Sequence, residues 1–244
     1  MDVYGFINVL FPPLLFIGTP IDEIYFDNLT MTDFYSVTAM LSLNGFGKMI
    51  LGDPSAIKNS SLQFNNIPTS TVPIINIDNI QILEVYDLQI TNMNGPTSSG
   101  SSIISLKSLD NTYILFDRII LKSVNLKKAP YIQLESPLKE ITIKNALFSN
   151  ISLDGEEYLF NLQILKSIQM MNLTFENINV TDDTDESTTL IKIGVLDLNS
   201  TLDSLISDIN INNSEASILR IDSFTNKIIS NKKRYIDYEL KICT

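Results

Sequence analysis

Hydrophobic positions in this chain follow a short pattern that returns at nearly constant spacing. Each copy has two apolar residues, a variable residue and a further apolar residue, and successive copies end 26 to 34 residues apart. Such a period is typical of a chain that stacks one supersecondary unit on the next, each unit burying the face that its neighbour leaves open. The copies end at Ile17, Leu43, Ile77, Leu106, Leu134, Leu162, Ile193 and Ile221.

The rest of each unit alternates between apolar and polar residues. In the unit that begins at Tyr131, a polar corner precedes Ile141 to Ile143, and a second corner at Asn145 precedes Ala146 to Ile151. Successive side chains of a strand point to opposite faces, so this alternation predicts strands with one buried face. We therefore expect three short strands in each unit, separated by two polar corners.

Asparagine occupies a repeated position near the end of the third strand. Asn tolerates left-handed backbone angles and can bond to its own main chain, which suits it to a corner. Copies stacked about 4.8 Å apart would let each amide donate to one neighbour and accept from the other. The predicted structural polar ladder comprises Asp33, Asn66, Asn92, Ser123, Asn150, Asn177 and Asn213, and the preceding corner carries a second polar column, Asn28, Ser61, Asp87, Arg118, Asn145, Asn172 and Asp208.

These features predict an all-β fold, a single-stranded right-handed parallel β-helix (solenoid) of about eight coils with three short strands per coil. A leucine-rich-repeat horseshoe is the alternative, but the segments after the Asn positions lack the helical spacing that its convex side needs. The repeat runs from end to end, so we expect residues 1–244 to form one domain. The penultimate residue, Cys243, suggests that this domain is a segment of a longer polypeptide.

Two strand types carry a resemblance to a known fold family. The strands Phe148 to Ile151 and Phe175 to Ile178 share the form F-x-N-I, and Ile103 to Leu106 has the form I-I-x-L. These strands resemble the repeats of pectin-lyase-like surface proteins, in particular those of large protist surface proteins, and more distantly those of bacterial polymorphic outer-membrane proteins. The resemblance implies a right-handed parallel β-helix that serves as an extracellular stalk, adhesive or assembly surface.

Charge and composition exclude several classes of partner. The net charge of −11 argues against nucleic acid and anionic lipid, because both need a basic surface. We find no apolar stretch of the roughly 18 residues that a transmembrane helix needs. A single cysteine excludes an intrachain disulfide, so that packing and backbone pairing must stabilise the chain.

The sequence predicts no catalytic, cofactor or metal site. Histidine is absent, which removes the most frequent general base and zinc ligand. Glycoside hydrolysis needs two carboxylates on one face, whereas Glu84, Glu176 and Asp222 fall in different columns. The acidic run from Asp182 to Glu186 lacks the EF-hand spacing and is interpreted as a solvated loop.

Sequons of the form N-x-S/T indicate candidate N-glycosylation sites, which must be exposed. Asn150 belongs to the predicted ladder, and we expect stacking to block it. The better candidates are Asn59, Asn179 and Asn199.

The function that we expect is a non-enzymatic structural or adhesive module, a rigid stalk or assembly surface for protein partners at the cell surface or outside the cell. Other proteins or adjacent repeats should cap the open solenoid ends, and glycans are a second class of partner. A carbohydrate-binding or carbohydrate-active protein is an alternative, in which Tyr25, Tyr86 or Tyr158 would be stacking platforms. An intracellular scaffold is a third reading.

Overall fold

The computed structural model describes most of the central part of the chain and short segments toward both ends. Three predicted sites, Asp33, Asn59 and Asn199, lie outside the described residues. The described residues are 2–4, 7–8, 15–17, 23–26, 29–32, 35–36, 41–44, 47–55, 62–67, 75–94, 102–127, 132–134, 138–154, 158–180, 189–195, 203–214, 217–222 and 241–243.

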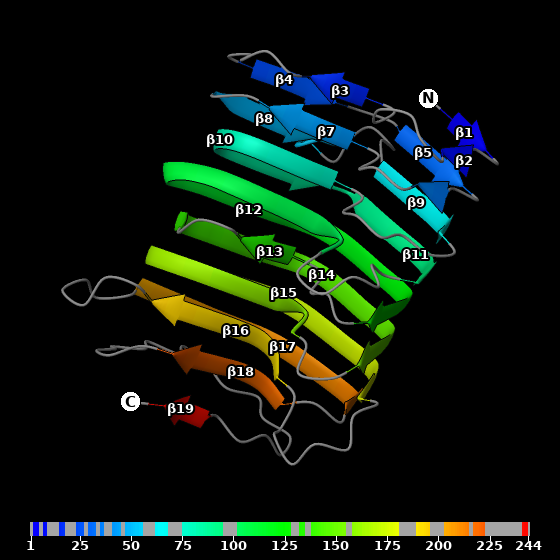
Figure 1. Cartoon of the computed structure of the whole chain (residues 1–244). Coiled ribbons are helices and arrows are strands. Elements are labelled where there is room, and N and C mark those ends of the chain that lie inside the picture. The colour runs from blue at the N-terminus through cyan, green and yellow to red at the C-terminus, as the bar shows by residue number, and fades with distance from the viewer. Residues whose placement is uncertain are drawn as a thin grey trace.

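The described residues form nineteen strands and no helix (Figure 1). The strands are β1 (Asp2–Tyr4), β2 (Ile7–Asn8), β3 (Leu15–Ile17), β4 (Glu23–Phe26), β5 (Leu29–Thr32), β6 (Tyr35–Ser36), β7 (Leu41–Asn44), β8 (Lys48–Leu51), β9 (Leu62–Ile67), β10 (Ile75–Tyr86), β11 (Leu88–Asn94), β12 (Ile104–Lys127), β13 (Ile132–Leu134), β14 (Leu138–Asp154), β15 (Phe160–Val180), β16 (Thr189–Val195), β17 (Asp203–Ser214), β18 (Ser217–Asp222) and β19 (Lys241–Cys243).

Parallel pairing stacks seventeen of these strands on three sides of a solenoid, and β2 pairs with β6 in a separate two-stranded sheet. The first side comprises β3, β7, the starts of β10 and β12, β13, the start of β15, β16, β18 and β19. The second comprises β4, β8, the end of β10, the middle of β12, the start of β14, the middle of β15 and the start of β17. The third comprises β1, β5, β9, β11 and the ends of β12, β14, β15 and β17.

The register of the first side confirms the repeat found in the sequence. Predicted copy ends stand directly opposite one another, as Ile17 with Leu43 and Ile77 with Leu106. At the other end, Ile193 faces Ile221, and Ile221 faces Ile242 of β19, which the sequence analysis missed. The fold is therefore an all-β parallel β-solenoid, and the horseshoe alternative is wrong. The total of about eight coils stays a prediction.

A continuous apolar core fills the solenoid. The five largest fully buried side chains are all phenylalanines: Phe64, Phe116, Phe148, Phe160 and Phe175. The rings of Phe148 and Phe175 are register partners and stack with 5.0 Å between their centroids. Full burial of such a side chain contributes roughly 1.5–3 kcal/mol, so the aligned aromatic residues stabilise the stacking of one coil on the next.

Both polar columns coincide with left-handed bends of the backbone. The non-glycine residues with positive φ in the columns are Asp87, Arg118, Asn145, Asn172 and Asp208 at the first bend, and Asn92, Ser123, Asn150, Asn177 and Asn213 at the second, with φ between 52° and 57°. One residue in this conformation turns the strand, while its side chain stays outside the core. Stacked coils place these residues in files that run along the solenoid.

Candidate functional site: two grooves along the polar corners

Arg118 is the centre of a network at the first bend. Its Nε donates to Oδ1 of Asp87 at 2.7 Å, and its Nη2 donates to Oδ2 of the same carboxylate at 2.9 Å. Nη2 also donates to the backbone oxygen of Asp53 at 2.6 Å. The hydrogen bond with Asp87 raises the pKa of Arg118 above its ordinary value, so the guanidinium stays charged.

Asp117 gathers three donors although its side chain is buried. Nη1 of Arg118 lies 3.1 Å from Oδ2, Nζ of Lys144 lies 3.4 Å from the same oxygen, and Nδ2 of Asn145 donates to Oδ1 at 2.8 Å. A buried carboxylate is tolerated only when it is paired and hydrogen-bonded, and this one is both. The cluster therefore joins neighbouring coils.

Tyr86 lies beneath Arg118 and is not a stacking platform. Its side chain is 8% exposed, and Cζ of Arg118 lies 5.3 Å from the centroid of its ring. Its hydroxyl donates to Oε2 of Glu84 at 3.1 Å. Burial raises the pKa of Tyr86, and the negative charge of Glu84 raises it further. The sequence-based expectation for Tyr86 is therefore corrected, because residues of the next coil cover its ring.

The first column continues as an amide ladder toward the C-terminus. Nδ2 of Asn172 donates to Oδ1 of Asn145 at 2.9 Å. Beside the column, outward residues of the third side border an open groove of 340 Å³, which we call the Arg118 groove. It is lined by Asp87, Arg118, Asn145 and Asn172 of the column and by Gln89, Ile119, Ile120, Ala146, Leu147 and Thr174.

The second column forms the ladder that the sequence suggested. Nδ2 of Asn177 donates to Oδ1 of Asn150 at 3.0 Å, and Nδ2 of Asn213 donates to Oδ1 of Asn177 at 2.9 Å. Asn92 and Ser123 occupy the equivalent bends of earlier coils. Asn66 lies within β9. Asn177 and Asn213 thus each link one coil to the preceding one.

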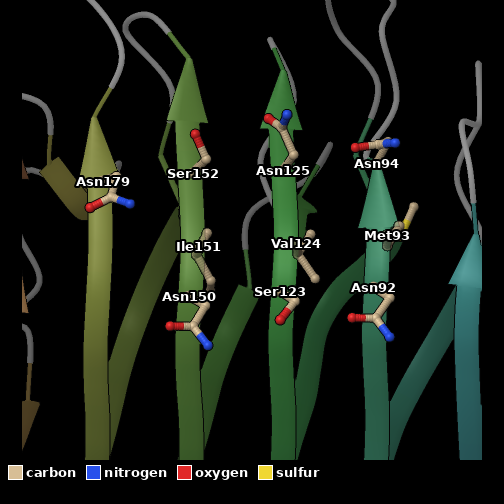
Figure 2. A pocket seen from close by; sticks show the side chains of 10 residues that line it. All are labelled: Asn92, Met93, Asn94, Ser123, Val124, Asn125, Asn150, Ile151, Ser152 and Asn179. Atoms are coloured by element: carbon tan, nitrogen blue, oxygen red, sulfur yellow. The ribbon is translucent and has the colours of Figure 1, made fainter.

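A larger groove follows the second column across β11, β12, β14 and β15. It has a volume of 540 Å³, and Figure 2 shows its polar side chains in two rows on one surface. We call it the Asn groove. The first row is Asn92, Ser123 and Asn150, the second row is Asn94, Asn125, Ser152 and Asn179, and between the rows lie Met93, Val124 and Ile151, which are buried.

The second row of the Asn groove contains an unsatisfied polar atom. Register pairs Asn94 with Asn125, Asn125 with Ser152, and Ser152 with Asn179. Oδ1 of Asn125 is buried and has no hydrogen-bond partner. Most buried polar side-chain atoms in native proteins are hydrogen-bonded, so this acceptor calls for an explanation.

Two sequons can be placed in this region. Asn179, the penultimate residue of β15, is exposed, as an acceptor of N-linked glycan must be. Asn150 is exposed as well, so stacking engages its oxygen without hiding the side chain. Stacking therefore leaves this side chain exposed, and its blockage as a glycan acceptor stays a prediction.

Across the described segments, no three His, Cys, Asp or Glu residues gather closely enough to hold a metal ion. Within the same segments no helix has the length and apolarity to span a bilayer.

Two features of the site were not predicted from the sequence. The polar column that contains Arg118 was expected, but its guanidinium also connects three coils through Asp53 and Asp87. The second feature is the left-handed bend at Asn79, where φ is 55°. A single Asn between Asp78 and Ile80, without copies at the same place in other units, gives little signal.

No family model matches the chain, and neither a curated protein nor a solved structure matches it. The assignment as a parallel β-solenoid therefore depends on strand register and burial alone.

Proposed function

We propose that the chain is a non-enzymatic structural or adhesive β-helix module, a rigid stalk or assembly surface for protein partners. The observation that supports this most is the in-register parallel pairing on all three sides, from β1 and β5 to β16 and β18. Hydrogen bonds across coils at both polar corners reinforce it. A pectin-lyase-like relationship and a place at the cell surface are part of this proposal.

The C-terminal end of the described core supports capping by a partner. Ile206, Ile209 and Ile211 of β17 are partly exposed. Their register partners in β15, Met170, Leu173 and Phe175, are 0–1% exposed. Apolar side chains that stay partly exposed on the last described strand of this side favour association with another chain or an adjacent repeat.

Light scattering with size-exclusion chromatography tests this proposal on residues 1–244 expressed alone. We expect concentration-dependent self-association, because the partly exposed apolar residues of β17 would pack against a second copy. Ile211→Lys should reduce the association, because the charge would be buried by the partner. Asn210→Lys, on the exposed face of the same strand, should leave it unchanged. A stable monomer at all concentrations would contradict the proposal of capped ends.

The cell-surface location has a separate test. We expect Asn179 to carry an N-linked glycan when the chain is isolated from its natural source. Enzymatic removal of N-glycans should then convert Asn179 to Asp, which mass spectrometry detects as a mass increase of about 1 Da. An unmodified Asn179 in the natural protein would favour the intracellular scaffold.

A further inference from the structure

We propose that the Asn groove binds a neutral oligosaccharide, whose hydroxyl groups hydrogen-bond to the two rows of amide and hydroxyl side chains. This inference depends on the solenoid fold and is independent of the role as a stalk.

The hydrogen-bonding groups of the groove match those of a sugar chain. An Asn side chain offers two donors and an acceptor, and a Ser hydroxyl both donates and accepts. Sugar hydroxyls likewise donate and accept. The second row presents such groups on four successive strands, at Asn94, Asn125, Ser152 and Asn179. A linear chain that crosses the strands would therefore meet equivalent partners at intervals of about 4.8 Å.

The charge of the groove disfavours ionic ligands. Its lining contains no Lys, Arg, Asp or Glu. A phosphate, a nucleic acid or an acidic polysaccharide would find no cation there, and the net charge of the chain is −11. A cation would find no carboxylate. The ligand that suits the groove is therefore uncharged and rich in hydroxyl groups.

The backbone of the groove disfavours a peptide that binds by strand addition. That mode needs an open sheet edge. At the groove, β12 pairs with β11 on one side and with β14 on the other, and β14 pairs with β15. The groove therefore offers only side chains for hydrogen bonding. Side chains suit a sugar chain, whereas a peptide that binds as a β-strand needs free backbone groups.

Asn125 gives the groove a hydrogen-bond acceptor that has no donor. Its Oδ1 is buried without a hydrogen bond, which is an unfavourable state for an amide oxygen. Rotation of the side chain into the groove would let Oδ1 accept from a ligand hydroxyl. Because this rotation breaks no hydrogen bond of Oδ1, binding gains the new bond at little cost.

The experiment uses the whole chain made in bacteria, so that no N-linked glycan on Asn179 competes for the groove. Calorimetry and NMR titration would test uncharged fragments of β-glucan, chitin, mannan and xylan. An oligogalacturonate and an uncharged hydrophilic peptide serve as comparators. We expect at least one neutral oligosaccharide to bind with saturation and with little dependence on salt, and the comparators not to bind.

Asn125→Leu separates a ligand-binding role from a structural one. The substitution removes the unsatisfied acceptor, so we expect a higher thermal unfolding midpoint together with an affinity at least about tenfold weaker. Asn210→Leu is the matched control, because Asn210 is exposed on β17 outside the groove, and it should leave the affinity unchanged.

Three outcomes would overturn the inference. They are no saturable binding of any neutral oligosaccharide up to about 10 mM, equal or tighter binding of the oligogalacturonate or the peptide, and undiminished affinity of Asn125→Leu. None of them bears on the self-association of residues 1–244, so failure of the glycan site and failure of the stalk role are distinguishable.

Discussion

Arg118 and Asp87 stand 31 positions apart in the chain and meet through two parallel hydrogen bonds, 2.7 Å and 2.9 Å long. The same guanidinium reaches the backbone of Asp53, a further coil back. A planar guanidinium that faces a carboxylate in this way tolerates little displacement. The pair therefore opposes slippage of one coil over the next at the first bend.

Loss of this pair should destabilise the protein. We expect Arg118→Ala to lower the free energy of unfolding by about 2 kcal/mol. Buried Asp117 would lose one of its hydrogen-bond donors, and the backbone oxygen of Asp53 would lose the donor Nη2 of Arg118. Arg118→Asn should lose less, because Asn adopts the left-handed angle readily and extends the column of amides. Urea unfolding measures both values, and equal losses for Ala and Asn would contradict this explanation.

Replacement of Asn177 separates the two contributions of a ladder residue. Asn177→Ala removes the bonds with Asn150 and Asn213 and places a Cβ-bearing residue without a polar side chain at φ 52°. We expect a loss of about 1–2 kcal/mol. Asn177→Gly loses the same bonds but adopts this angle freely, so its loss should be smaller. A larger loss for Gly than for Ala, again in urea, would show that the left-handed angle is unimportant.

Alkaline solution should weaken the fold through Tyr86. Its pKa in the folded state is raised above the ordinary value of 10.0. Above about pH 10 the unfolded chain therefore loses this proton while the folded chain keeps it. The unfolded state then binds fewer protons, and the free energy of unfolding falls as the pH rises. Urea unfolding from about pH 8 to about pH 11 should show this fall, and Tyr86→Phe should make it shallower. The same slope in both proteins would assign the effect to other groups.

Gly52 should not tolerate a larger residue. Its φ is +89°, and a Cβ at this position would collide with the backbone carbonyl of Tyr86. We expect Gly52→Ala to cost at least about 2 kcal/mol, because both the backbone angle and the contact become unfavourable. Ile82→Ala, at an exposed position of β10, is the control and should change thermal stability little. A Gly52→Ala protein with an unchanged unfolding midpoint would rule out the close approach.

The solenoid could be predicted because its signal is both local and repeated. Apolar residues point inward at the same place in successive coils, as Ile77 and Leu106 do, so the register of the strands can be predicted from the sequence. The strand Lys241–Cys243 was not predicted because it has only three residues. Periodicity has little power over so short a segment.

The environment of the polar corners could be predicted only in part. Asn150 and Asn177 belong to the residue type that favours left-handed bends, and both lie at one. Arg118 and Ser123 have no such preference and take the bend because the coils on either side impose it. The burial of Tyr86 could not be predicted either. Alternation predicts that its ring points outward, but it does not predict that Arg118 of the next coil lies over the ring.

The amide ladders also have a direction. Asn172, Asn177 and Asn213 each donate to the amide one coil toward the N-terminus, and the oxygen of Asn177 accepts from the coil that follows. A repeat of this kind donates through its amide to the repeat before it and offers an amide oxygen to the repeat after it. Duplication or deletion of one entire repeat of this kind would therefore leave no amide orphaned, and the length of the molecule could change in whole steps during evolution without redesign of its interior.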